Sequence, residues 1–233
     1  MEAEKVGDEE DIVVQRVCMP NGQVYMDDVN PGVVLPADLV LEAMGEELKY
    51  MTKRRIWVPR SIQECWEKTG KLPVSVKWVK TNKLYPEGVD VRCRLVARDF
   101  KAGDKHRDDL FAEAPPLEAK RTLISRAATQ RRDGRWRSLM FIGAKKAHLN
   151  PKCEDDVYNQ LPPEVPTEKG MCGKLVHWLY GFGPAAAAWE RYYADKFEEK
   201  GFQRGLTCGM VLYHPELDVS MAVHGDDFTL CGL

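Results

Sequence analysis

The sequence predicts an α+β fold in which an antiparallel sheet is layered against helices. Three observations lead to this class. Residues 74–80 and 89–100 alternate between apolar and polar side chains, as strands do. Apolar residues recur at helical spacing near 41–51 and 189–197. Strands and helices also do not follow the regular alternation of a parallel sheet. With 233 residues, of which 44% are hydrophobic, the chain can form one large domain or two small ones.

The first part of the chain is acidic. Residues 1–50 carry 12 acids and 3 bases, net −9, so residues 51–233, with 31 bases and 24 acids, have a net charge of +7. Two interpretations stay open: an acidic, partly disordered leader on an ordinary domain, or a basic groove downstream. Residues 1–35 lack periodicity and contain NG and NPG turn signals. We therefore predict an irregular leader over 1–35, with room for one short hairpin, and a folded domain over 36–233.

The first predicted helix is amphipathic and about three turns long. Its apolar positions, which we expect to face the core, are Leu41, Met44, Leu48 and Met51. Beyond it, the strand signals at 74–80 and 89–100 are joined by the turn-rich segment TNKLYPEG. We predict an antiparallel pair of strands there.

The second of these strands separates apolar residues from arginines. Its alternating apolar positions are Val89, Val91, Cys93, Leu95 and Ala97. The period of two then places Arg92, Arg94 and Arg98 on the opposite face. This face is either the solvated side of a sheet or a phosphate-binding surface, because guanidinium groups match phosphate oxygens.

The second half of the chain alternates less regularly. We predict a helix over 118–132, with Leu123, Ile124, Ala127 and Ala128 on one side, and a short apolar strand over 138–143. A further helix has an aromatic stripe expected in the core, formed by Trp189, Tyr192, Tyr193 and Phe197, and Gly201 ends it. The chain closes with VLYH, the turn PELD, and then VSMAV and FTLC around HGDD, a strand-turn-strand pattern.

Composition argues against several classes of protein. The seven cysteines are irregularly spaced without a CxxC, and there is no HExxH, so disulfide frameworks and zinc sites are not expected. No apolar run reaches membrane-spanning length, and the acidic start is unlike a secretory signal. We expect an intracellular protein.

Asp226 and Asp227 are adjacent acids at the predicted hairpin turn. Adjacency alone indicates nothing, because Asp27–Asp28, Asp108–Asp109 and Asp155–Asp156 are also pairs and need ordinary, solvated explanations. The pair at 226–227 is either a metal-binding turn or an acidic surface turn.

Seven segments, in one order, resemble the reverse transcriptase of copia-type LTR retrotransposons. They are KWV (77–79), RCRLVARDF (92–100), FAEAPPLEAKRTL (111–123), GAKKAHLN (143–150), DVYNQLPPE (156–164), LYGFGPAAAAW (179–189) and VHGDDF (223–228). The family shows KWVFK, KARLVAKGF, FAPV with TIR, DVKTAFLNG, VYMxQPPGF, LYGLKQAPRAW and YVDD at these places.

The resemblance implies the fingers and palm of a right-hand polymerase, with an antiparallel palm sheet packed on helices. Partners would be an RNA template, an RNA–DNA or DNA primer duplex and deoxynucleotide triphosphates, in the cytoplasm, with DNA integration as the element's next step. Two Mg²⁺ ions would serve the reaction. Asp226 and Asp227 match catalytic metal ligands, Arg92 and Arg94 match triphosphate contacts, and His148 matches the aromatic residue under the nucleotide sugar.

The sequence also departs from the family. Gly143 stands where the first metal-binding aspartate of DVKTAF belongs, so we predict that polymerase activity is lost. Gly183, Pro184, Ala186 and Ala187 replace the polar and proline positions of LYGLKQAPRAW. Leu233 follows the acidic turn closely, so we expect the thumb to be absent and the chain to be a truncated, degenerate copy. Alternatives are a catalytically dead nucleic-acid-binding or scaffold protein, and a remnant that folds poorly.

Overall fold

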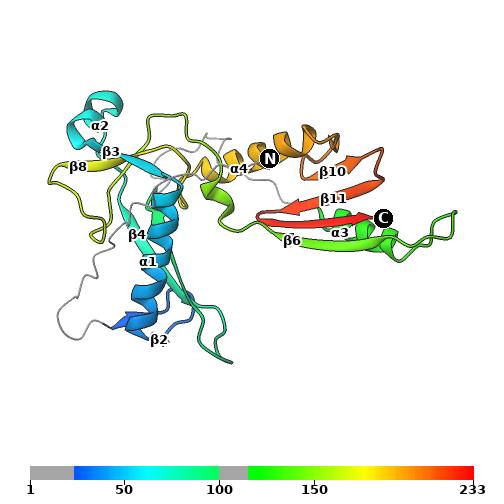
Figure 1. Cartoon of the computed structure of the whole chain (residues 1–233), viewed down its shortest axis with the longest axis horizontal. Helices are drawn as coiled ribbons and strands as arrows, with labels where there is room; N and C mark the ends of the chain where they lie inside the picture. Colours follow the sequence, from blue (N-terminus) through cyan, green and yellow to red (C-terminus); the bar gives the residue numbers. More distant parts are fainter. Residues whose placement is uncertain (1–23, 100–114) are drawn as a thin grey trace, which may run out of the picture. The chain divides into compact units, whose positions relative to one another are not determined.

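The computed structural model describes residues 24–99 and 115–233. These residues form two compact units. The first unit comprises 24–97 and 156–175, and the second comprises the described residues from 98 to 155 and from 176 to 233 (Figure 1). Residues 1–23 of the predicted leader lie outside the described residues.

Named strands pair antiparallel throughout the described chain, in agreement with the predicted α+β class. The first unit contains β1 (Tyr25–Met26), β2 (Val34–Leu35), α1 (Ala37–Lys53), β3 (Trp57–Ser61), α2 (Ile62–Thr69), β4 (Val76–Asn82), β5 (Val91–Ala97), β7 (Tyr158–Asn159) and β8 (Met171–Leu175). The second contains α3 (Leu117–Ala127), β6 (Ser138–Gly143), the 3₁₀ turn η2 (Ala147–Leu149), α4 (Ala185–Glu198), β9 (Gln203–Arg204), β10 (Val211–His214), β11 (Val219–His224) and β12 (Asp227–Gly232).

In the first unit, α1 packs against β5. Val40 and Met44 of the helix meet Cys93 of the strand in one apolar cluster. The expected position of Leu41 in this core was wrong: Leu41 is 42% exposed and Val40 is fully buried. Because helical residues advance about 100° each, the stripe that faces β5 begins one residue earlier than predicted. Val89 was predicted as the first alternating apolar residue of the strand, but β5 begins at Val91 and Val89, which precedes it, is 55% exposed.

The β1–β2 pair is the one short hairpin for which the sequence left room. Asp27, which is 6% exposed, fastens it to β4 by accepting N–H bonds from Val29 (2.7 Å), Asn30 (2.9 Å) and Asn82 (2.8 Å). Burial by itself would raise the pKa of Asp27, but these bonds and one from the Asn30 side chain hold it well below its usual range. The expectation of a solvated pair is therefore wrong for Asp27.

Of the other two acidic pairs, the structure describes Asp155–Asp156. Asp156 forms ion pairs with Lys174 (2.5 Å) and Lys68 (3.8 Å), an ordinary surface arrangement. Asp108–Asp109 lies outside the described residues.

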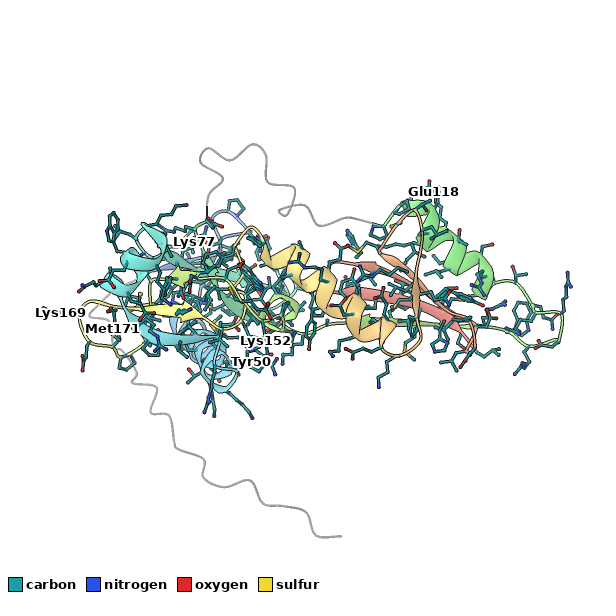
Figure 2. All side chains as sticks on the ribbon, turned by 90° about the horizontal axis from the view of Figure 1, so that it is seen from above. Tyr50, Lys77, Glu118, Lys152, Lys169 and Met171 are labelled. Carbon is teal, nitrogen blue, oxygen red and sulfur yellow. The ribbon has the colours of Figure 1, made fainter. Side chains whose placement is uncertain are left out.

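Sequence reasoning missed α2 and the sheet ordered β3–β8–β7 beside it. The Ser61 hydroxyl accepts the N–H of Glu64 at 3.0 Å and caps α2, and Gly70 ends the helix at φ +64°. Ser-x-x-Glu at 61–64 is a helix-start pattern that was available in the sequence. Figure 2 shows Lys169 and Met171 near the start of β8, where β8 pairs with β3.

The second unit is built on a five-stranded sheet ordered β6–β12–β11–β10–β9. Neighbouring residues on β11 point to opposite faces: Val223 packs with α4, and Ala222 packs with Leu123 of α3. The two helices therefore cover opposite faces of this sheet. Strand β6 forms one edge of the sheet.

Helix α3 is shorter than predicted. It ends at Ala127, not at residue 132, because the Arg131 amide enters a turn by donating to the Arg135 carbonyl at 2.9 Å. Ile124 and Ala128 were predicted on one side of the helix with Leu123, but Leu123 is buried whereas both of them are exposed, Ile124 by 53%. The residues of α3 that pack against the sheet are Leu123, with Ala119 and Ala127 beside it.

The aromatic stripe of α4 largely occupies the core. Trp189 is 6% exposed and Tyr193 is 3% exposed, and Phe197 packs against the same cluster. Tyr192, predicted in the core, is 37% exposed and stacks on the outer side of Trp189, with ring centroids 5.9 Å apart. The larger of the two apolar clusters that flank the sheet thus lies between α4 and the sheet.

Candidate active site

The candidate site is the turn between β11 and β12. His224 pairs with Asp227, so Gly225 and Asp226 are the two central residues of a tight hairpin. Gly225 has φ +63°, a conformation open to glycine and unfavourable for most other residues. The strand-turn-strand pattern predicted from VSMAV, HGDD and FTLC is present.

Helix α4 fixes this turn from one side. The Trp189 indole N–H donates to the Gly225 carbonyl at 2.8 Å. The Phe228 ring, one residue after Asp227, lies edge-on to Trp189 at 6.3 Å and to Tyr193 at 5.4 Å between centroids. The aromatic core therefore holds the backbone that carries Asp226 and Asp227.

Strand β6 brings Gly143 beside the turn. Gly143 is the register partner of Asp227, and the next amide, that of Ala144, donates to the Asp226 carbonyl at 2.7 Å. A Cβ atom on Gly143 would lie 3.5 Å from Oδ1 of Asp227, an ordinary van der Waals contact. A side chain at 143 would thus meet the Asp227 carboxylate directly.

His148 lies a short distance along the chain from Gly143, on η2. Its ring is partly buried and meets Tyr180 edge-on, with centroids 5.6 Å apart. Its role under a nucleotide sugar stays a prediction.

The predicted arginines lie on β5. Arg92 and Arg94 are exposed on one face, opposite the buried Cys93 and Leu95. Arg92 lies 3.6 Å from a carboxylate oxygen of Asp90, measured from Nε. Arg98, predicted on the same strand face, follows the end of β5 and belongs to the second unit. Arg92 and Arg94 belong to the first unit, whereas Asp226 and Asp227 belong to the second.

A family model of reverse transcriptase (RNA-dependent DNA polymerase) matches residues 66–233. The chain belongs to this reverse transcriptase family. A search of curated proteins found no match. The family generally uses divalent metal ions, and its substrates are a nucleic-acid template and deoxynucleotide triphosphates. Among the described helices, none has the length and apolarity needed to cross a bilayer.

The residues of this reverse transcriptase hairpin do not fit a pair of divalent ions. Asp226 and Asp227 are exposed, and over residues 24–99 and 115–233 no three His, Cys, Asp or Glu side chains form a group that could hold a metal. Mg²⁺ requires several hard oxygen ligands at close range. Lys145 and Lys146 follow Gly143 by two and three residues and add positive charge on the same segment.

Sequence reasoning also missed an arginine-rich surface of the second unit. Asp218, in the turn between β10 and β11, accepts hydrogen bonds from Arg126, Arg131 and Arg137. The available signal was the run QRRDGRWR at residues 130–137, which is dense in guanidinium groups.

Proposed function

We propose that the chain is a copia-type reverse transcriptase domain in which nucleotidyl transfer is lost at Gly143. In this proposal the first unit corresponds to the fingers and the second to the palm, and the protein acts in the cytoplasm. The observation that carries it is the register partnership of Asp227 with Gly143 at the hairpin. In the resemblance, an aspartate belongs at position 143, so the register supports the assignment of the missing ligand to that position.

Charge explains why the loss matters. Two-metal transfer needs carboxylates that converge on ions about 4 Å apart. Removing one of three carboxylates takes a unit of negative charge from a site that must hold four positive charges. Lys145 and Lys146 make the segment still less favourable for cations. Asp226 and Asp227 would remain at the hairpin turn, but the two carboxylates alone would not hold the two metal ions that nucleotidyl transfer needs.

The substitution Gly143→Asp tests the proposal. Gly143 does not have a positive φ, and its added Cβ would meet only an ordinary contact, so the backbone tolerates a side chain there. A carboxylate directly across from Asp227 would share a cation with it, because opposed side chains on paired strands lie about 5 Å apart. We expect Mn²⁺ to bind at least tenfold more tightly than to the wild type in calorimetry.

Gly143→Asn is the matched control, because it has the same shape and no charge. We expect it to bind Mn²⁺ as weakly as the wild type. Equal affinity of the Asp and Asn variants would show that position 143 is not the site of a lost ligand. Magnesium-dependent primer extension by the wild-type protein, abolished by Asp226→Asn, would refute the loss of activity.

A second candidate function is nucleic-acid binding or scaffolding without catalysis. The exposed face of β5, with Arg92 and Arg94, favours it. We expect an RNA–DNA duplex to bind at low salt and its affinity to fall steeply as salt rises. Arg92→Gln with Arg94→Gln should weaken this binding, whereas the exposed lysines Lys49 and Lys53 changed to Gln should not. A duplex that fails to bind the wild type at low salt would exclude this function.

A further inference from the structure

The arginine-rich surface lies where the loop between α3 and β6 meets the turn between β10 and β11. We define the arginine cluster as Arg126, Arg131, Arg132, Arg135 and Arg137. Arg126 donates to Oδ1 of Asp218 at 2.7 Å, Arg137 donates to Oδ2 at 2.9 Å, and Arg131 donates to the same carboxylate. The single carboxylate of Asp218 thus holds three guanidinium groups in place.

The cluster carries more positive charge than these contacts neutralise. Its acidic neighbours are Asp133, which bonds Arg131 and Arg135, together with Glu216 and Asp218 of the facing turn. Five arginines against three acids leave a net charge of +2. Anchoring the loop to the turn needs only the arginines that reach Asp218.

The remaining groups of the loop face solvent. Arg132 is exposed, and the Arg135 side chain is 62% exposed. Between Arg135 and Arg137 stands Trp136, which is 58% exposed. A large exposed aromatic ring flanked by guanidinium groups combines a stacking surface with phosphate contacts, the pairing that single-stranded nucleic acids require.

The arginine cluster is separate from the hairpin that carries Asp226 and Asp227. It adjoins the Ser138 end of β6, whereas the hairpin adjoins the Gly143 end. Six residues of strand separate these ends by about 17 Å, at about 3.3 Å per step. A nucleic acid bound at the arginine cluster therefore contacts a surface distant from the hairpin that carries Asp226 and Asp227.

We propose that the arginine cluster and Trp136 bind single-stranded RNA, with the guanidinium groups on phosphates and the indole stacked on a base. This goes beyond the proposed function, since it needs neither a metal ion nor a nucleotide pocket. The arginines held by Asp218 fix the shape of the loop, and Arg132, Arg135 and Trp136 make the contact.

The test is the anisotropy of a fluorescein-labelled 20-nucleotide uridine RNA, titrated with the wild-type protein in EDTA at several salt concentrations. Arg132→Gln with Arg135→Gln should lower the slope of log affinity against log salt by about 1.4, at about 0.7 per lost contact. Trp136→Ala should weaken binding roughly 5- to 100-fold, because an aromatic platform contributes strongly to each stacked base.

Two controls keep the result specific. Lys49→Gln with Lys53→Gln removes the same charge from α1 and should leave the slope unchanged. If that pair has the same effect as the arginine pair, binding is general charge attraction and the proposal fails. It also fails if the wild type does not bind at low salt, or if Trp136→Ala binds as the wild type does. Gly143→Asp, titrated with the same RNA, should bind as the wild type does, because position 143 lies at the other end of β6. A failure of the RNA proposal can therefore be told apart from a failure of the proposal about the lost metal ligand.

Discussion

Replacing Asp218 with Asn isolates the charge at the centre of the arginine cluster. The residue has φ +50°, a left-handed conformation that Asn tolerates about as well as Asp. The substitution therefore preserves backbone and shape. It removes the negative charge that accepts hydrogen bonds from Arg126, Arg131 and Arg137. It also turns an amide N–H₂ group, which is a donor, toward guanidinium groups that are donors too.

The magnitude follows from the three contacts. A hydrogen bond to a charged group contributes about 1.5–3 kcal/mol, against about 1 kcal/mol for a neutral one. The Asp218 side chain is 24% exposed and those of its three partners are 16–29% exposed, so solvent screens part of this difference. We expect Asp218→Asn to lower the free energy of unfolding of the second unit by about 2–4 kcal/mol.

Urea unfolding followed by tryptophan fluorescence measures this loss. Asp133→Asn is the control: its carboxylate bonds Arg131 and the exposed Arg135 within the same loop, so it should lower the free energy of unfolding clearly less than Asp218→Asn does. Burial would raise the pKa of Asp218, but bonds from Arg137 and Arg126 lower it to about 2 from 3.8. Its contribution is therefore present above about pH 4 and disappears between about pH 4 and 2. Equal losses for both variants, or a difference from wild type that does not shrink over that range, would refute the reasoning.

Two further predictions concern the cores. Phe228→Ala should destabilise the second unit by about 3–5 kcal/mol in the same urea assay, because the ring is 6% exposed among aromatic neighbours; Thr229→Ala, on the opposite face, should cost under about 1 kcal/mol. Burial raises the pKa of Cys93 to about 12 and that of Cys172 to about 11, so neither should react with iodoacetamide at pH 8 in the folded protein, whereas partly exposed Cys208 should. Mass spectrometry that finds Cys93 alkylated as fast as Cys208 would contradict this.

Local patterns were sufficient where a segment has one consistent period. The alternation in residues 91–97 correctly separates the arginines from Cys93 and Leu95, because a strand allows only two directions for side chains. The stripe of α4 correctly places Trp189 and Tyr193 in the core. The errors at Leu41 and Ile124 arise because period alone leaves the rotation of a helix uncertain by one residue, and the packing partner sets that rotation.

The sequence by itself determined the α+β class, the strand-turn-strand pattern around Asp226 and Asp227, and the family resemblance that marks Gly143 as a departure. Only the tertiary structure decided that Gly143 lies opposite Asp227, because strand register joins residues 84 positions apart through backbone pairing that no local pattern specifies. It alone also brought Asp218 to arginines that lie 81 to 92 residues earlier in the chain. Charges so distant in sequence attract one another strongly only after the sheet has brought them within hydrogen-bonding range.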